Sequence, residues 1–282
     1  MLRFAFNTAG CANNRLFDAL DIIAETGFDG AVIALDVHHL DPMADDYEDA
    51  AHALKEKLDT LNLAACIDTS ARFLLDPREM YEPTLLHPTE DGRALRLNFL
   101  RRSAKVCKIL DGEAVTFWSG RPMRSVSPAN AGAWLLDGLK QTADICAEEG
   151  VVAALEPRPG HMVGSLDDFK VVRDAVKQMT DSPIKLALGT GHCLVVNDRE
   201  PHQAVKEFAP ILGNVSIEDM TRGAHKHLPL GDGDMDLPTL LAALEEVDYA
   251  LLVDVKLPLD SHRAPEMITA AYDYVQEHLP SD

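Results

Sequence analysis

The chain has 282 residues, with 26 Lys and Arg against 46 Asp and Glu, and its formal net charge is −20 at pH 7. A composition of 46% hydrophobic and 26% charged residues is typical of a folded protein with a substantial core and excludes a disordered chain. The negative charge argues against nucleic acid or an anionic membrane as the main partner. The sequence contains no run of 18 apolar residues and therefore predicts no membrane span.

Short apolar runs alternate with amphipathic segments along the whole chain. The predicted strands are 2–6, 30–35, 63–67, 114–118, 151–155, 184–188, 215–217 and 250–255. The predicted helices are 16–26, 45–61, 94–110, 132–149, 166–179, 203–212, 237–247 and 265–278. Residues 72–92 carry three prolines without a clear period, which predicts a long loop after the third strand. Apolar strands separated by helices predict a parallel sheet covered on its outer face.

Eight strand–helix units in a chain of this length suit a single (β/α)8 TIM barrel over residues 1–282. A doubly wound open sheet is the alternative fold, but no GxGxxG motif follows the first strand. Active sites of barrels form at the carboxyl ends of the strands, so polar residues there are candidates for chemistry. These residues are Asn7, Asp36, His38, Asp68, Trp118, Glu156, Arg158, His192, Glu218, Asp219, Asp254 and Lys256.

The alternation of side chains along a strand groups some of these candidates. Glu156 and Arg158 should share one face of the fifth strand, and Asp254 and Lys256 one face of the eighth. Glu156 ends the apolar run VVAAL, and a carboxylate in such surroundings needs a partner. A purely structural salt bridge, to Arg158 or Lys256, is the alternative to a functional role for Glu156.

Four segments of the chain resemble the xylose-isomerase-like barrel superfamily. They are ALEPRPG at 154–160, LGTGHCL at 188–194, NVSIEDMTRGAHKHLPLGDGDMD at 214–236 and DSHRAPE at 260–266. This superfamily includes sugar-phosphate isomerases and epimerases, inosose dehydratases and endonuclease IV-type enzymes. The resemblance implies one divalent metal (Mn, Mg, Co or Zn), held by a Glu after strand five, an Asp after strand six, a His on strand seven and a Glu on strand eight.

At most two of these four ligands are present, and the favoured register leaves one. The resemblance places the strand-five ligand at Glu156, and the other three positions hold Gly189, Ser216 and Lys256. A shift of two residues on the eighth strand would put the last position at Asp254 instead. An ammonium group has no lone pair for a metal, so we expect no metal cofactor there and expect Lys256 to replace its charge.

The resemblance also implies a small polyhydroxylated or keto substrate and isomerase, epimerase or lyase chemistry through an enolate-like intermediate. Such a reaction needs a base, for which Glu156 and His192 are candidates, and an electrophile, for which Lys256 is the candidate. A Schiff base on Lys256 is less favoured, because the adjacent Glu156 raises the pKa of the amine. The predicted substrate-binding residues are Asn7, His38, Arg158, Asp219, Arg222, His225 and His262.

Two other functions stay open. The barrel could be a pseudoenzyme that binds a metabolite or a protein partner without turnover. Alternatively, His225 and His227 could join His192, His262 or His38 in a relocated divalent-metal site. For the enzyme we expect a small-molecule substrate, no nucleic acid and no membrane, and the resemblance leaves a homo-oligomer open.

Smaller features receive structural interpretations. The GDGD run at 231–234 is predicted to be a turn before a helix capped by Asp236 rather than a calcium loop. Cys193, beside His192, is predicted to be a buried thiol pointing away from it. The five cysteines are scattered and lack CxxC spacing, which predicts free thiols and a cytoplasmic protein.

Overall fold

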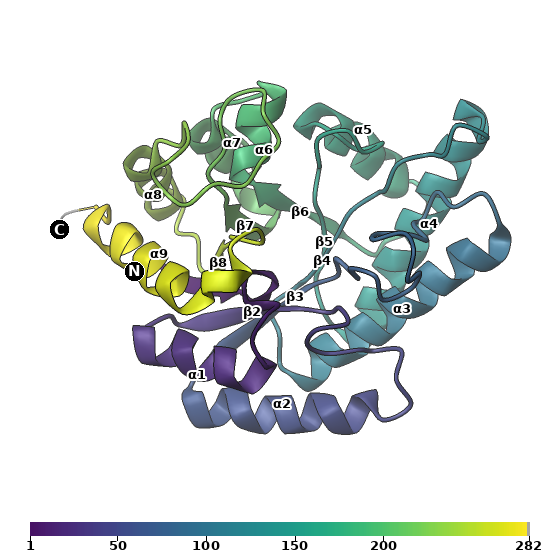
Figure 1. Ribbon diagram of the computed structural model, residues 1–282. Coiled ribbons are helices and arrows are strands. Elements are labelled where there is room, and N and C mark those ends of the chain that lie inside the picture. Colours follow the sequence, from purple (N-terminus) through teal and green to yellow (C-terminus); the bar gives the residue numbers. More distant parts are fainter. Residues whose placement is uncertain (281–282) are drawn as a thin grey trace.

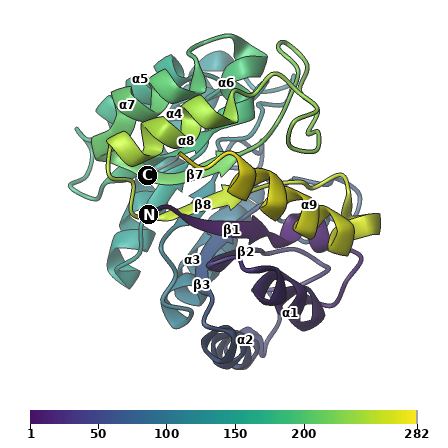
Figure 2. The same ribbon diagram turned by 90° about the vertical axis from the view of Figure 1, so that its left-hand side faces the viewer.

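The computed structural model describes residues 1–280, and eight parallel strands of this part of the chain close into a barrel in sequence order. The strands are β1 Arg3–Asn7, β2 Gly30–Ala34, β3 Ala64–Asp68, β4 Val115–Phe117, β5 Ala153–Leu155, β6 Ile184–Gly189, β7 Leu212–Ile217 and β8 Leu252–Val255. Figure 2 shows β1 beside β8, where the barrel closes. The predicted (β/α)8 barrel is confirmed.

The helices surround the barrel in the same order as the strands (Figure 1). They are α1 Leu16–Thr26, α2 Tyr47–Leu61, α3 Glu90–Ile109, α4 Pro128–Glu149, α5 Leu166–Val176, α6 Thr190–Val196, α7 Pro201–Phe208, α8 Leu237–Glu246 and α9 Ala264–Glu277. Short 3-10 turns cover Thr8–Cys11, Ala209–Ile211 and Ser261–Arg263. No helix within residues 1–280 is both long and apolar enough to cross a membrane.

Side chains alternate strictly between the two faces of the strands. On β1, Phe4 and Phe6 join the large core between barrel and helices, whereas Ala5 belongs to a separate cluster. That second cluster consists mainly of small side chains, namely Ala5, Val32, Cys66, Ala114, Ala154, Ala187 and Leu252. The polar side chains at the carboxyl end of the barrel continue the series of these inward positions. Asn7 and Asp68 each follow a cluster member by two residues, as do Glu156 and Asp254.

Local sequence signals set several helix ends. Gly27 ends α1 in the left-handed conformation, with φ of 112°, as expected for a C-terminal stop. Asp236 caps α8 by accepting a hydrogen bond from the Thr239 amide, which confirms the predicted turn and cap. Ser127 caps α4, so that helix begins at Pro128, four residues before the predicted start.

The prediction for the segment after β6 was wrong in one respect. His192 and Cys193 do not lie at the end of a strand but in the short helix α6. Cys193 is nevertheless buried, and burial raises the pKa of its thiol to about 12. The other four cysteines are also buried and free, as predicted.

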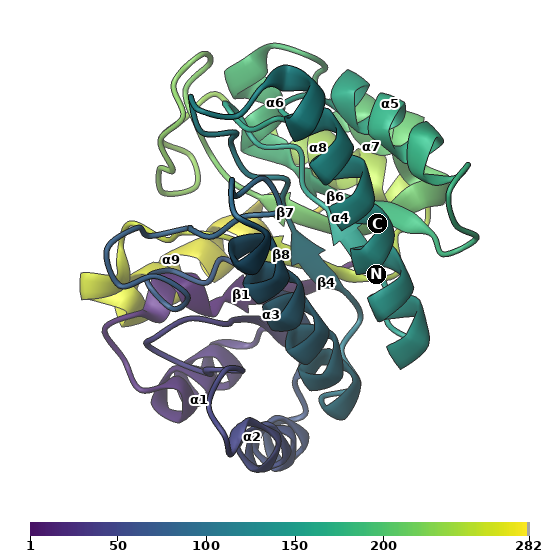
Figure 3. The same ribbon diagram turned by 90° about the vertical axis from the view of Figure 1, so that its right-hand side faces the viewer.

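Long loops gather at the carboxyl end of the barrel. In Figure 3 the loops that follow β3 and β7 project on the side of the molecule opposite the N-terminus. Asp219 holds the loop after β7 in place, because its carboxylate accepts hydrogen bonds from the amides of Gly231, Gly233 and Met235. This loop carries His225 and His227 over the mouth of the barrel.

Candidate active site

Lys256 lies at the centre of the barrel mouth, among three carboxyl groups. Its Nζ atom is 3.1 Å from Asp68 Oδ2, 3.8 Å from Glu156 Oε1 and 3.9 Å from Glu218 Oε1. The side chain is only 13% exposed. Burial alone would lower the pKa of the amine, but the charges of Asp68, Glu156 and Glu218 outweigh it and raise that pKa. Lys256 is therefore a cation, in agreement with the argument against a Schiff base.

Asp254 and Asn7 form a polar layer below Lys256. Both residues are buried, and Asn7 Nδ2 donates to Asp68 Oδ2 and Asp254 Oδ2, each at 3.2 Å. Ser216 Oγ donates to the same Asp254 oxygen at 2.9 Å. Burial raises the pKa of Asp254 to about 7. The two inward residues at the end of β8 thus differ in role. Asp254 forms hydrogen bonds with Asn7 and Ser216 inside the barrel, whereas Lys256, just after the strand, reaches the mouth.

Two carboxyl groups around Lys256 titrate in opposite directions. Burial would raise the pKa of Asp68, but the charge of Lys256 and hydrogen bonds from Lys256 and Asn7 lower it to about 2. Glu218 is completely buried, and both its oxygens lack a hydrogen-bond partner within the described chain. Its burial raises its pKa to about 8 despite the nearby Lys256. Burial thus favours the protonated form of Glu218, whereas Lys256 and Asn7 favour the ionised form of Asp68.

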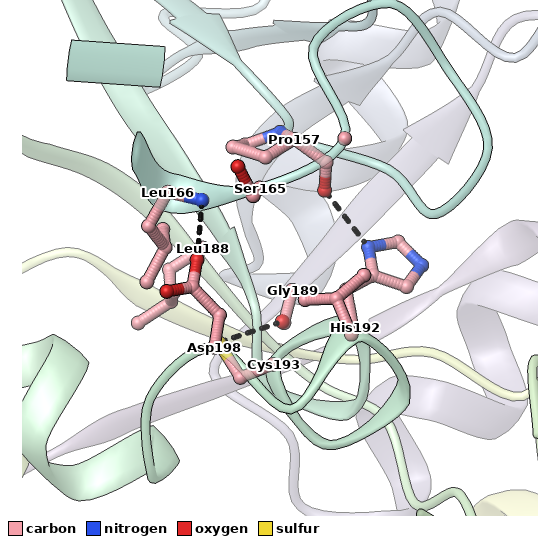
Figure 4. Close-up of a pocket in the computed structure, with 10 residues that line it drawn as sticks. Pro157, Ser165, Leu166, Leu188, Gly189, His192, Cys193 and Asp198 are labelled. Atoms are coloured by element: carbon pink, nitrogen blue, oxygen red, sulfur yellow. Dashed lines mark hydrogen bonds between the residues drawn. The ribbon is translucent and has the colours of Figure 1, made fainter. Parts of the chain in front are cut away.

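His192 packs against these carboxyl groups from α6. Its Nδ1 is hydrogen-bonded to the carbonyl oxygen of Pro157 (dashed in Figure 4), at 3.2 Å. The same atom lies 3.6 Å from Glu156 Oε1. Its Nε2 lies 3.4 Å from Glu218 Oε2. Burial, with the charge of Arg158 and other neighbours, lowers the pKa of His192 well below its usual value. His192 is thus a neutral imidazole at pH 7, which can donate from Nδ1 to Pro157 and keep a lone pair on Nε2.

The wall on the β4 and β5 side is aromatic and cationic. Trp118 meets Tyr81 and His161 edge to face, with ring centroids 5.6 and 5.1 Å apart. The Arg158 guanidinium lies 5.3 Å from the Tyr81 ring centroid and 6.0 Å from that of Trp118. The Arg96 guanidinium lies 4.6 Å from the same indole ring.

Two cavities open at this end of the barrel. One, of about 380 Å³, is lined by Asp68, Lys256 and His227, with apolar Leu259 on its edge. The other, of about 390 Å³, lies over Trp118, Arg121 and His161. The two share four lining residues, Met80, Tyr81, Arg158 and His225. Together they give room for a small organic substrate.

The structure brings together some predicted site residues. Glu156, Lys256 and His192 lie within ion-pair distance of one another or of shared carboxyl groups. Arg158 and His225 line both cavities. Of the three predicted catalytic residues only Lys256 lines a mouth cavity, whereas Glu156 and His192 are buried beside it. The catalytic and substrate-binding roles stay predictions.

Other predicted substrate-binding residues lie elsewhere. Arg222 is exposed and forms an ion pair with Glu200 at 2.8 Å, and His38 and His262 are exposed. Neither mouth cavity is lined by these three residues. Asn7 and Asp219 are buried and hydrogen-bonded within the protein, so they support the site from behind.

Sequence reasoning gave no role to several groups that the fold brings into the site. Asp68 and Glu218 were among the strand-end candidates, and the inward series on β7, from Ser216 to Glu218, could have identified the second. Tyr81 and His161 come from loops and had no periodic signal. Only the folded chain shows that both contact Trp118.

The residues present do not fit a divalent metal at the position that the family uses. Gly189 offers no ligand, and a Cβ built there would lie 2.5 Å from His192 Nδ1. The Ser216 hydroxyl is bonded to Asp254, and the Lys256 ammonium contacts the carboxylates that a cation would need. Asp254, the other candidate for the strand-eight ligand, lies in the deeper layer with Asn7.

Donor atoms do cluster nearby in another arrangement. Within residues 1–280, two groups place possible ligand atoms within 4.8 Å of one another: His192 with His225 and His227, and Glu156 with His192 and Glu218. Nitrogen and carboxylate donors of this kind suit zinc and related ions. A metal at a relocated position is therefore chemically plausible.

Solved structures share the fold of this chain. The chain resembles the IolI protein, crystallised with a zinc atom, at a TM-score of 0.75 and 19% identity, covering 99% of this chain and 100% of that one. D-allulose 3-epimerase from Methylomonas sp., in complex with D-allulose, matches at a TM-score of 0.75 and 17% identity. The match covers 98% of this chain and 97% of that one. D-psicose 3-epimerase from Clostridium cellulolyticum H10, with D-tagatose, matches at a TM-score of 0.75 and 15% identity. The match covers 99% of this chain and 100% of that one.

Sequence comparison gives the family. No curated protein matches the chain. The family described as xylose isomerase-like TIM barrel matches residues 20–278, which is most of the sequence. The chain belongs to the xylose isomerase-like TIM barrel family.

Proposed function

We propose that this protein is an isomerase, epimerase or lyase that acts on a small polyhydroxylated or keto substrate without a divalent metal. Family membership and structural neighbours that are epimerases support an enzyme of this general class. The observation that carries the proposal is the Lys256 ammonium, held 3.1 to 3.9 Å from three carboxyl groups at the mouth of the barrel.

The proposed chemistry passes through an enolate. Glu156, or His192 through Nε2, takes a proton from the carbon next to the substrate carbonyl. The C–H electron pair forms a carbon–carbon double bond, and the carbonyl oxygen gains a negative charge that Lys256 stabilises. Return of a proton to carbon gives an isomer or epimer, and loss of a β-hydroxyl group as water gives dehydration. Glu218, whose protonated form burial favours, is the proposed proton donor.

Solvent deuterium exchange tests this step without knowledge of the product. The protein is incubated in D2O with a panel of ketoses, aldoses and their phosphates, and NMR detects deuterium at the carbon next to the carbonyl. We expect exchange that persists in EDTA. It should fall at least about a hundredfold in Lys256→Met and Glu156→Gln, because lost electrostatic stabilisation or lost proton transfer each costs this much.

Controls separate lost catalysis from lost folding. Lys177→Met removes an exposed lysine on the distal end of α5 and should keep wild-type exchange. Circular dichroism of each variant checks that it is folded. Exchange that disappears in EDTA and returns with Zn or Mn would overturn the metal-independent mechanism. No exchange with any substrate of the panel would favour a non-catalytic binding protein.

A specific observation favours a second candidate, a metal-dependent isomerase or epimerase with relocated ligands. The rings of His192, His225 and His227 have centroids 5.1 to 6.4 Å apart, and His192 Nε2 and His227 Nδ1 are buried without a hydrogen-bond partner in the described chain. The nearby charges of Arg158 and Lys256 oppose a cation at this place. The test measures the metal content and the thermal shift with Zn for wild type and for His225→Ala. One bound ion per chain in wild type, lost in the variant, would select this metal-dependent candidate.

A further inference from the structure

Arg158 stands at the junction of the two mouth cavities. It comes from the chain just after β5, two residues beyond Glu156, and lines both spaces. Lys256 lines one of these cavities, and Arg121 and His161 line the other. A ligand that reaches Lys256 with one end can therefore extend past Arg158 into the second cavity.

The guanidinium of Arg158 has no partner for its N–H groups. Among the hydrogen bonds and ion pairs of residues 1–280, none involves this side chain, although Glu156 lies two residues away. By contrast, Arg72 is bound by Asp36 at 2.6 Å. Arg158 is held instead by its contacts with the faces of Tyr81 and Trp118. A partly buried, fixed guanidinium with free N–H groups is suited to bind an oxyanion through two parallel hydrogen bonds.

Two other groups of the second cavity can also donate hydrogen bonds to an anion. His161 Nδ1 is buried without a hydrogen-bond partner in the described residues, and Arg121 makes one long hydrogen bond, of 3.4 Å, to the Pro159 carbonyl oxygen. Burial and the charges of Arg158 and Arg121 lower the pKa of His161 to about 3, so it is a neutral hydrogen-bonding group.

Two acidic residues, Glu79 and Glu82, also line the second cavity and oppose the binding of an anion. Glu82 accepts a hydrogen bond from the Thr84 amide at 3.0 Å, which occupies one of its oxygens, and Glu79 is exposed. Arg96 contacts the same indole as Arg158 and is close enough to Glu82 for their charges to interact. In a chain with a net charge of −20, the guanidinium groups of Arg158, Arg121 and Arg96 outnumber the two carboxylates that line this cavity, which favours anions there.

We propose that the substrate carries an anionic oxygen group, a carboxylate or a phosphate, which binds between Arg158, Arg121 and His161 while its carbonyl end reaches Lys256. The second half of this statement rests on the proposed function. The anion subsite would distinguish this chain from the epimerases above, whose structures hold the uncharged sugars D-allulose and D-tagatose.

Anion binding can be measured without turnover. Titration calorimetry with inorganic phosphate and with malonate, at constant ionic strength, is compared between wild type and Arg158→Gln. We expect the variant to weaken binding of the preferred anion at least about tenfold, as for loss of a charge-assisted hydrogen bond. Arg124→Gln, which removes an exposed arginine outside both cavities, should stay within about twofold of wild type.

The outcome of the titrations shows whether the subsite exists and which anion it binds. Binding of phosphate alone, lost in Arg158→Gln, assigns a phosphate subsite, and binding of malonate alone assigns a carboxylate subsite. Equal affinity in wild type and Arg158→Gln, or no binding of either anion, overturns the subsite. If Arg158→Gln does not fold, Arg158→Lys keeps the charge but loses the two-pronged donor, and it should still weaken binding. Anion binding that depends on Arg158 in a protein without deuterium exchange would uphold the subsite and reject the enzyme.

Discussion

Lys256 differs from a metal ion in the number and direction of its bonds. A divalent ion accepts lone pairs from all sides, whereas an ammonium group donates three hydrogen bonds and carries one charge. Only Asp68, at 3.1 Å, is close enough for a good hydrogen bond, while Glu156 and Glu218 lie at 3.8 and 3.9 Å. Two N–H groups of Lys256 therefore remain for the oxygen atoms of a substrate.

Glu218 should make the stability of the protein depend on pH in a defined direction. Its pKa is about 8 in the folded protein against an ordinary value of 4.5, so the folded state holds this proton more tightly. The stability it contributes is full below pH 4.5 and is lost as the pH rises through 8. In Glu218→Gln, which cannot ionise, the melting temperature minus that of wild type should increase between about pH 5 and pH 8 and then level off.

Calorimetric melting curves at several pH values check this prediction. Asp254, whose pKa is about 7, titrates in both proteins, so its effect largely cancels in the difference. A difference that stays constant over this range would show that Glu218 is already ionised at neutral pH.

Sequence reasoning identified the inward series on single strands but not the contacts across the barrel. Period-two alternation places Glu156 with Arg158 and Asp254 with Lys256, and in the structure all four point inward, with Asp254 one layer below Lys256. The partner closest to Lys256, however, is Asp68 on β3. Which strands face each other depends on the closure and stagger of the whole barrel, and no local pattern encodes it.

At the scale of single elements, α6 shows how tertiary contacts override a local pattern. The run LGTGHCL contains two glycines and a β-branched residue, and it has weak helix propensity. Thr190 Oγ1 nevertheless donates to the Ser216 carbonyl oxygen and accepts from the Glu218 amide, which ties the start of α6 to β7. This attachment directs His192 into the mouth, an orientation that propensity could not predict.

The capping box of α5 gives a prediction at the same scale. Ser165 accepts a hydrogen bond from the Asp168 amide, and the Asp168 carboxylate accepts one from the Ser165 amide. Ser165→Ala should lower the free energy of unfolding by about 1 kcal/mol, because the Asp168 amide loses its acceptor. Urea titration measures the loss.

A matched control is available for this helix cap. Ser125→Ala changes an exposed serine in the loop before α4 and should leave the urea midpoint unchanged. Equal midpoints for both variants would mean that water replaces the Ser165 hydroxyl at no cost.

At the scale of the whole molecule, charge repulsion should limit stability at low salt. The chain carries a net charge of −20, and self-repulsion destabilises a compact state. Raising NaCl from about 10 mM to about 150 mM shortens the screening length from about 30 Å to about 8 Å. We expect the melting temperature to rise over this interval. A melting temperature that falls would indicate that the ion pairs around the barrel outweigh the repulsion.

Gly189 also bears on how this protein can evolve. A carboxylate at position 189 would clash with His192 and lie beside Glu218, because a Cβ there comes within 2.5 and 3.1 Å of these side chains. A glutamate at position 256 would remove the one ammonium group that contacts Asp68, Glu156 and Glu218. Each of these two substitutions, made alone, should therefore lower the stability of the protein. The side chains around positions 189 and 256 are therefore coupled, and a metal site at this place would need several simultaneous mutations.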